Sequence, residues 1–259
     1  RDRISIRGPK RRLRFGVSAA HGDCTTLMYV QRMIASAQQR EIGLTFGRTM
    51  LHYAKSRSIE DKAMAEIPAN SPNVDQWLKL IHADGVGPVL FARLLKRFGS
   101  AEAALGTSAS QLAKVDGVGY KTAERIAATR DQFDAERELA LARKAGVWLV
   151  HLKDQRYPRL LGRIYDPPPV LYVKGTLDRG DALAISIVGS RRCSLYGTEQ
   201  ASRLAHFLGA AGFTICSGMA RGIDTAAHEG ALAAEARTIA VQGCGLARVF
   251  PPENRKLFG

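Results

Sequence analysis

The sequence predicts an α/β protein in which a small all-helical domain precedes an open parallel sheet. From residue 147 onward, short runs rich in β-branched residues alternate with helical segments, which is typical of a parallel sheet built from β-α-β units. Residues 74–146 instead carry apolar residues at helical spacing. Residues 1–72 show neither period clearly, so no fold is predicted for them.

These patterns divide the chain into three regions. Residues 1–72 are basic, open on the cluster RDRISIRGPKRRLR, and close on IPANSPN, which has the composition of a linker. We expect this region to be flexible or non-native, because Met64 stands just before the first strongly patterned helix. Residues 73–146 form the predicted helical domain, and residues 147–259 form the predicted sheet domain.

The charge of the chain points to its class of partner. Lys and Arg exceed Asp and Glu by 14, and the isoelectric point is near 10.0. An excess of this size predicts a polyanionic partner, most often nucleic acid. Basic surface charge that only keeps the protein soluble is the alternative.

Composition also narrows the compartment. No stretch approaches the roughly 18 uninterrupted apolar residues of a membrane span, and the N-terminus lacks the apolar core of a signal peptide. The cysteines Cys24, Cys193, Cys216 and Cys244 are scattered, with no C-x-x-C pair or histidine cluster. We therefore expect a cytoplasmic protein with no metal or other cofactor.

Helix signals define the elements of the helical domain. VDQWLKLIHA predicts one helix, and PVLFARLLKRF predicts the next, with Pro88 at its first position and Gly99 after its end. Ser100 is placed to cap the short AEAAL segment. One long helix is expected from about Tyr120 to Ala145, ended by Gly146.

The helical domain contains an internal repeat. DGVGPVLFARLL begins at Asp84 and DGVGYKTAERIA begins at Asp116, and each repeat reads helix, G-x-G hairpin, helix. This resembles the helix-hairpin-helix motif of DNA-binding proteins, in which glycines permit a tight turn with positive φ and free N–H groups meet a phosphate. The hairpin glycines would be Gly85, Gly87, Gly117 and Gly119, with Lys121 adding charge. Alternatively, G-x-G only joins packed helices.

The sheet domain is predicted from strands and helices in alternation. VWLVHL is the first candidate strand, and residues 170–173 are extended after a proline-rich passage. LAISIVG, FTICSG and RTIAVQG follow as strands. Helices are expected between them from about Thr198 to Ala211 and from about Ile223 to Ala236.

Two glycine-containing loops follow successive strands of this domain. Ligands of open α/β sheets bind beyond the carboxyl ends of the strands, and adjacent β-α units usually pair adjacent strands, so both loops should lie side by side. Glycine permits a sharp turn and close approach, arginine offers forked donors to phosphate, and a helix start adds its dipole and free N–H groups. The first loop comprises Gly189, Ser190, Arg191 and Arg192, and the second comprises Ser217, Gly218, Arg221 and Gly222 before the helix at Ile223.

The usual nucleotide fingerprints are absent from the sequence. Neither G-x-G-x-x-G nor G-x-x-x-x-G-K-[ST] occurs at these loops. An arginine-rich pocket without either fingerprint suits the sugar-phosphate backbone of a strand at least as well as a free nucleotide.

Four further residues near the loops are weighed between a chemical role and a structural or incidental one. Asp224 and His228 share a helix face and could form an acid–base pair, although Asp224 as a cap or partner of Arg221 and His228 as a packing residue is favoured. Cys193 stands beside the arginines and is interpreted as incidental. Tyr196 either stacks on a base or packs on the helix.

Three segments together resemble one protein family. IVGSRRCSLYG, SGMARGIDTAAHEGAL and TIAVQGCGLARVFPPENRKL are similar to the DNA-processing protein A family, also called Smf, and the likeness extends over about residues 74–259. The resemblance implies a Rossmann-like sheet preceded by a helix-hairpin-helix or SAM-like domain. It also implies a cytoplasmic, non-enzymatic protein that binds single-stranded DNA, protects incoming strands during natural transformation and loads the recombinase RecA.

The resemblance also assigns residues and raises one rival. Its first signature falls on Gly189, Ser190 and Arg191, with the arginine on DNA; its second falls on Ser217, Gly218, Arg221, Gly222, Ile223 and Asp224. Members continue with further strands that carry most dimer contacts, so the sheet is expected to be incomplete here and a homodimer to depend on those parts. The rival is a nucleotide-hydrolysing enzyme of the lysine-decarboxylase-like group, whose signature P-G-G-x-G-T-x-x-E is absent here.

Overall fold

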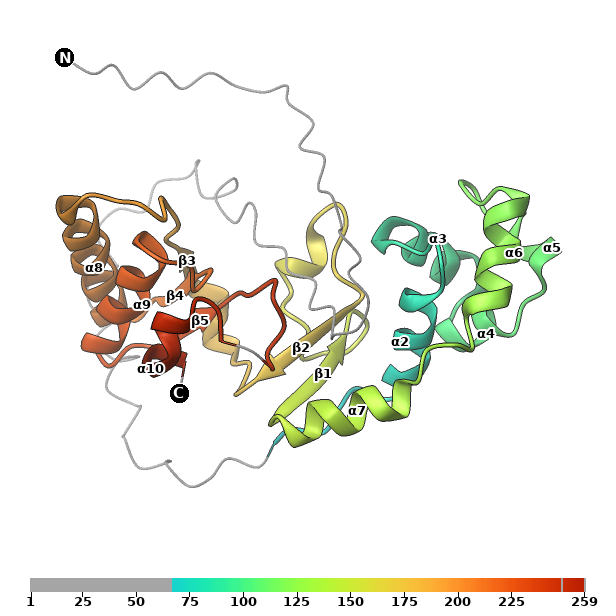
Figure 1. The fold of residues 1–259 in the computed structure, drawn as a ribbon, viewed down its shortest axis with the longest axis horizontal. Coiled ribbons are helices and arrows are strands. Elements are labelled where there is room, and N and C mark those ends of the chain that lie inside the picture. The colour runs from blue at the N-terminus through green and yellow to red at the C-terminus, as the bar shows by residue number, and fades with distance from the viewer. Residues whose placement is uncertain (1–66, 248, 259) are drawn as a thin grey trace, which may run out of the picture.

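A computed structural model describes residues 67–247 and 249–258 of the chain, so the expectations for the basic N-terminal cluster and Met64 lie outside the described residues. Figure 1 shows a helical part at one end of the molecule, a two-stranded sheet in the middle, and a three-stranded sheet with its helices at the other end. The predicted fold class is confirmed, because helices precede a Rossmann-like parallel sheet. Among the described residues, no helix is long and apolar enough to cross a membrane.

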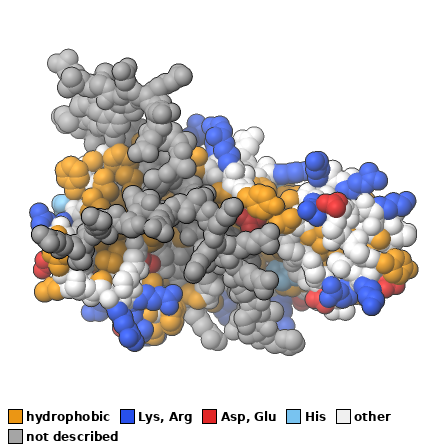
Figure 2. Space-filling model, turned by 90° about the horizontal axis from the view of Figure 1, so that it is seen from above, with side chains coloured by type: hydrophobic (Ala, Val, Ile, Leu, Met, Phe, Trp, Pro, Cys, Tyr) orange, Lys and Arg blue, Asp and Glu red, His pale blue; other side chains and the backbone are white. Residues whose placement is uncertain are grey.

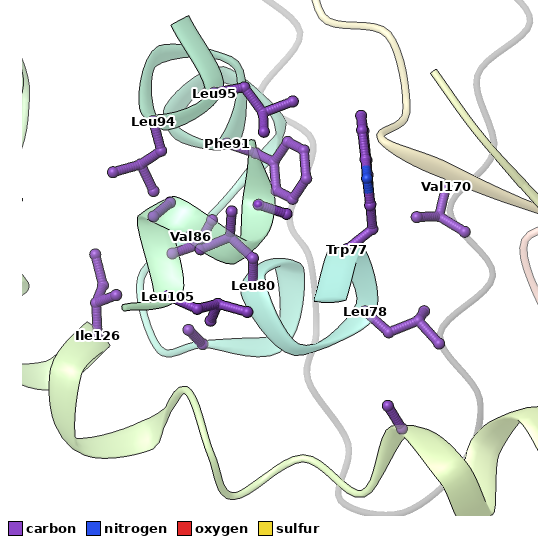
Figure 3. Close-up of a cluster of buried hydrophobic side chains, with 14 of the residues drawn as sticks. Trp77, Leu78, Leu80, Val86, Phe91, Leu94, Leu95, Leu105, Ile126 and Val170 are labelled. Atoms are coloured by element: carbon purple, nitrogen blue, oxygen red, sulfur yellow. The ribbon is translucent and has the colours of Figure 1, made fainter. Parts of the chain in front are cut away.

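The helical part is built around one apolar core. Its helices are α2 (Val74–His82), α3 (Pro88–Phe98), α4 (Ala101–Leu105), α5 (Ala109–Leu112), α6 (Tyr120–Thr129) and α7 (Ala135–Lys144). Trp77, Leu80, Phe91, Leu94 and Ile126 are buried and converge from three of these helices, as Figure 3 shows. Ser100 caps α4 as predicted, because its hydroxyl accepts a hydrogen bond from the Ala103 N–H at 3.1 Å.

The single long helix expected over 120–145 is wrong, since α6 and α7 are separate. Asp134 starts α7 by accepting the Arg137 N–H at 2.9 Å, which is the action of an N-cap residue. Phe133 in the break stacks on His82, with ring centroids 3.8 Å apart. A cap and an apolar anchor therefore favour an interruption that helical periodicity alone does not reveal.

The two hairpins brace one another. Arg93 on α3 donates to the carbonyl of Asp116 at 2.8 Å and lies 3.1 Å from its carboxylate. The Asp84 N–H in turn donates to the Thr129 hydroxyl on α6 at 2.8 Å. Each hairpin thus docks against the helix that follows the other hairpin.

The hairpin glycines divide into two kinds. Gly85 and Gly117 have φ of +88° and +83°, as predicted. Gly87 and Gly119 do not turn the chain with positive φ: they have φ of −100° and −72° and stand at the N-caps of α3 and α6. Only the first glycine of each G-x-G is therefore required by backbone conformation.

Strands β1 (Val147–His151) and β2 (Val170–Lys174) form an antiparallel pair of their own. The expectation of a single parallel sheet after residue 146 is corrected by this pairing. The connection over 152–169 holds only the short helix η1 (Leu161–Arg163), and no crossover helix is available to make the strands parallel. Val147, Leu149 and Val170 extend the helical core.

The parallel sheet has the order β3-β4-β5, with β3 (Ala184–Ser186), β4 (Thr214–Ser217) and β5 (Thr238–Ala240). Helices α8 (Leu195–Ala210) and α9 (Ile223–Ala233) provide the crossovers, close to their predicted positions. The remaining short helices are η2 (Arg179–Leu183), η3 (Pro252–Asn254) and α10 (Arg255–Phe258). At Gly230, an added Cβ would lie 2.2 Å from the Ser202 carbonyl oxygen, so α8 and α9 pack at backbone distance.

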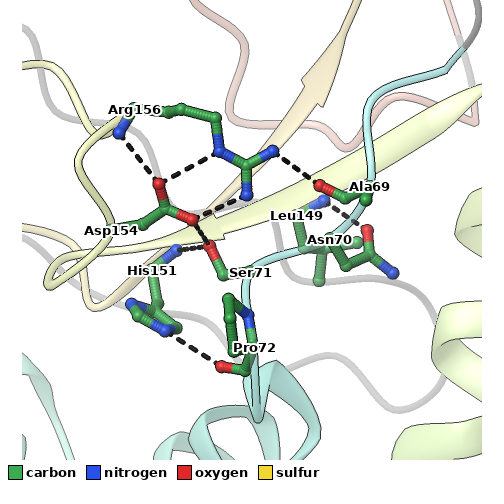
Figure 4. A network of polar contacts seen from close by, with 8 residues as sticks. All are labelled: Ala69, Asn70, Ser71, Pro72, Leu149, His151, Asp154 and Arg156. Atoms are coloured by element: carbon green, nitrogen blue, oxygen red, sulfur yellow. Dashed lines mark hydrogen bonds and ion pairs between the residues drawn. The ribbon is translucent and has the colours of Figure 1, made fainter.

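The segment before α2 is bound to the free edge of β1, although its composition resembles a linker. The Ser71 N–H donates to the Leu149 carbonyl at 2.9 Å, and the Ser71 hydroxyl donates to the Asp154 carboxylate at 2.5 Å. Arg156 holds that carboxylate from the other side at 2.6 Å (Figure 4). This polar network fastens the segment to the strand.

Asp154→Asn should destabilise the protein by about 1–3 kcal/mol, the cost of weakening charge-assisted hydrogen bonds at a side chain that is only 9% exposed. Thermal unfolding measures the change. Asp131→Asn is the control, since that side chain is 82% exposed and lies 3.8 Å from Arg130, and it should change the unfolding free energy by less than about 0.5 kcal/mol.

The same network predicts a pH dependence. Hydrogen bonds from Arg156 hold the pKa of the Asp154 carboxyl well below its ordinary value of 3.8. Because the folded pKa is the lower one, the stabilisation is complete above the ordinary pKa and is lost as the pH falls through and below it. Wild-type unfolding free energy should therefore decrease more steeply than that of Asp154→Asn from about pH 5 downward. Parallel curves for the two proteins would contradict this assignment.

Candidate nucleic-acid interface

The two glycine loops lie side by side, as predicted, at the carboxyl ends of β3 and β4. The strands are parallel, with Ser186 opposite Cys216. Beyond them, the Ile187 N–H donates to the Cys216 carbonyl at 3.0 Å, and the Ser217 hydroxyl donates to the Ile187 carbonyl at 2.7 Å. These bonds hold the starts of both loops in register.

The loops meet through backbone atoms. The Ile223 N–H donates to the Ser190 carbonyl at 3.2 Å, so this N–H of the α9 start is engaged rather than free, in contrast to the expectation from sequence. At Gly222, φ is +79° and an added Cβ would lie 2.3 Å from the Ser190 carbonyl oxygen. At Gly189, an added Cβ would lie 2.7 Å from Cγ1 of Ile223. Only glycine fits at both positions.

Asp224 is a buried brace between the loops. Its carboxylate accepts long hydrogen bonds from the Gly189 N–H at 3.4 Å and the Ala220 N–H at 3.3 Å, one from each loop. A Cβ at Gly218 would lie 2.7 Å from the same carboxylate. Ile223 and Asp224 therefore hold the loops in place, and neither presents its side chain to solvent as the arginines do.

His228 has the contacts of a packing residue. It is almost fully buried, and its Nδ1 lies 2.7 Å from the Thr238 hydroxyl. That hydroxyl donates to the Ile215 carbonyl at 2.8 Å, so it accepts from the histidine. Burial lowers the pKa of His228 and favours the neutral ring. The structure thus favours the packing interpretation over an acid–base pair with Asp224.

The arginines differ in what they contact. Arg191 and Arg192 are exposed, and neither has an ion pair within the described residues. Ser190 shapes their turn, since its hydroxyl accepts the Arg192 N–H at 3.1 Å. Arg221 is instead paired with Glu253, to which its Nε and Nη2 donate at 3.0 and 2.7 Å.

Sequence reasoning missed two residues of this site, Glu253 and Asn254. The Asn254 amide is buried and donates to the Met219 carbonyl at 2.9 Å and the Thr225 hydroxyl at 2.8 Å. Met219 has φ of +58°, an uncommon conformation for a residue with a side chain, and Asn254 holds it there. The two prolines before Glu253 are a local signal of a turn, but the sequence does not indicate that this turn lies beside Arg221.

Cys193 and Tyr196 also lie near the first loop. The Cys193 sulfur lies 3.1 Å from the Thr198 hydroxyl, which is not a base. Among the described residues, no histidine or carboxylate is hydrogen-bonded to this sulfur. Tyr196 is 70% exposed, so it is not packed against its helix and is available to a ligand. No group of three or more metal-ligating side chains occurs among the described residues.

The excess of positive charge is divided unevenly along the chain. Lys and Arg outnumber Asp and Glu by seven in residues 1–72, by two in 73–146 and by five in 147–259. In Figure 2, Lys and Arg side chains are visible in several areas of the face that the grey atoms leave uncovered. Net charge alone therefore does not locate a binding site within the chain.

Two family models match this chain. The model of DNA recombination-mediator protein A matches residues 148–259, and that of the DprA-like N-terminal HHH domain matches residues 73–140. Protein Smf of Synechocystis sp. is 39% identical over 186 residues, which cover 70% of this chain and 47% of that protein. The DNA processing protein DprA of Streptococcus pneumoniae is 42% identical over 104 residues, covering 40% of this chain and 36% of the relative.

A solved structure is also similar. The X-ray structure of DNA processing protein A from Streptococcus pneumoniae aligns with a TM-score of 0.59 at 28% identity, covering 71% of this chain and 62% of the other. The chain spans about half the length of the Synechocystis relative that it matches.

Gly222→Ala should destabilise the protein by at least about 2 kcal/mol, because alanine is strained at this φ and its Cβ would collide with the first loop. Thermal unfolding measures the loss. Gly243→Ala is the matched control, since its φ is not positive and nothing lies within 4 Å of an added Cβ. Equal melting temperatures for both variants would show that the loops do not meet as described.

Proposed function

The chain belongs to the DNA-processing protein A family, also called DprA or Smf, and from this membership we propose that it binds single-stranded DNA through its two glycine loops. One observation carries the proposal: two exposed arginines without ion-pair partners, Arg191 and Arg192, stand on a loop fixed by backbone contacts to its neighbour. Relatives named DNA processing protein support the class of ligand.

The proposed mechanism is positioning without chemistry. The guanidinium groups of Arg191 and Arg192 bind phosphate oxygens by charge-assisted hydrogen bonds, and the exposed ring of Tyr196 offers a stacking surface for a base. Contacts of these kinds distinguish bases poorly, so binding has little sequence preference and weakens with salt. The buried positions of Asp224 and His228 favour a binding role over catalysis.

In the cell, we place this binding in DNA uptake and recombination. The protein would coat incoming single strands in the cytoplasm during natural transformation, protect them and load the RecA recombinase onto them. Homodimerisation would extend the contact along a strand. A recombinase-loading assay on strands precoated with single-strand-binding protein tests this role separately from DNA binding.

Arg191→Ala should weaken binding of a labelled single-stranded oligonucleotide by about 1–3 kcal/mol, the range for a charge-assisted contact. The slope of log K against log salt should also decrease in magnitude by about 0.7, which corresponds to one phosphate contact fewer on a single strand. Fluorescence anisotropy at several salt concentrations, with a duplex for comparison, measures both quantities.

Arg203→Ala is the control for this experiment. Arg203 is an exposed arginine on α8 outside both loops, so its removal lowers the net charge equally and should leave binding nearly unchanged. Equal losses for the two variants, or equal binding of single strands and duplex, would mean that charge acts generally.

The nucleotide-hydrolysing alternative is tested by incubating the protein with nucleoside monophosphates and measuring released base. We expect no release above a blank. Release that Arg191→Ala abolishes would replace the binding proposal with an enzymatic one.

A further inference from the structure

The ion pair between Arg221 and Glu253 sets the second loop apart from the first. Both partners are more than half exposed, at 56% and 61% of their side-chain surface, and two guanidinium nitrogens share one carboxylate oxygen. Arg191 and Arg192 have no such counter-ion among the described residues. The two loops thus contain two arginines without an ion-pair partner among the described residues and one, Arg221, that is already paired with a carboxylate.

Glu253 is held beside Arg221 by a built element. Its neighbour Asn254 is buried and bonded to Met219 and Thr225, which belong to the second loop and to α9. Pro251, two residues earlier, is also buried. The Glu253 carboxylate is therefore held beside Arg221, because the backbone next to it is fixed to the second loop and to α9.

We propose that Glu253 is a built-in competitor that occupies Arg221 in the free protein and must yield it to a DNA phosphate. This inference rests on the proposed function. It means that the second loop adds to the affinity for DNA only when a phosphate displaces the Glu253 carboxylate from Arg221. A phosphate oxygen and a carboxylate oxygen accept from a guanidinium in the same geometry, so one can replace the other. Exchange is feasible because an exposed ion pair is weak in water.

The competition has a consequence for the two loops. Strand binding begins at Arg191 and Arg192, which need no displacement, and reaches Arg221 only when a phosphate lies close enough to replace the carboxylate. A short or poorly placed anion gains nothing from the second loop. A strand that crosses both loops gains the additional contact.

The test is a double-mutant cycle on Arg221 and Glu253, measured by anisotropy with a labelled oligothymidylate long enough to cross both loops. Glu253→Gln should tighten binding by about two- to fivefold, the range that an exposed ion pair allows. Arg221→Gln alone should have a smaller effect than Arg191→Ala. Arg221→Gln combined with Glu253→Gln should lose the gain.

Glu229→Gln is the matched control, because Glu229 is an exposed acid further along α9 and its removal changes the net charge by the same amount. Circular dichroism establishes that each variant is folded, and Glu253→Ala should repeat the direction of Glu253→Gln. Unchanged or weaker binding by both Glu253 variants would overturn the proposal, as would a gain that persists without Arg221 or appears equally in Glu229→Gln.

The two proposals fail in different ways. If Arg191→Ala loses affinity but Glu253→Gln gains none, the loops bind DNA and only the competition is wrong. If Arg191→Ala is without effect, the glycine loops are not the binding site, and both proposals fall.

Discussion

The contact between the Ser190 carbonyl and the Gly222–Ile223 backbone is the constraint on which the rest of the candidate site depends. It brings two loops that are separated along the chain to within hydrogen-bond distance, and it leaves no room for a side chain at Gly222. The buried Asp224 carboxylate then accepts a hydrogen bond from each loop. The exposed arginines of the first loop therefore stand on a fixed backbone. Binding of a ligand then costs less conformational entropy than it would on a loop that had to become ordered first.

The rest of the described fold is organised around its own apolar clusters. The helical part and the β1–β2 pair share a core, and a polar network around Asp154 fastens the incoming chain to β1. The parallel sheet has a separate apolar cluster formed mainly by small residues of α8 and α9. Alanine and glycine along these helices allow close packing, as the approach of Gly230 to Ser202 shows. The core of the helical part is thus filled by large side chains, whereas the cluster beside the parallel sheet depends on the close approach of two helix backbones.

Much of this arrangement could be predicted from sequence, because its signals are local. The strand-then-glycine pattern placed both loops, and β-α-β connectivity placed them side by side. What could not be predicted depends on contacts between distant residues. Asn254 and Glu253 reach the second loop from more than 25 residues away, as their bonds to Thr225 and Arg221 show. The break between α6 and α7 depends on a capping aspartate and on Phe133 meeting His82, which periodicity does not record.

The mutual bracing of the two hairpins also bears on how the helical part folds. Helical domains usually form from contacts between near neighbours in the chain, and they fold rapidly for that reason. Here the first hairpin is bonded to Thr129, 45 residues beyond Asp84, and the second is bonded to Arg93, 23 residues before Asp116. Each hairpin therefore takes one of its hydrogen-bond partners from the other repeat. The duplicated unit thus has contacts between distant residues as well as local ones, which raises its contact order, and each half alone lacks the partner to which its hairpin is bonded.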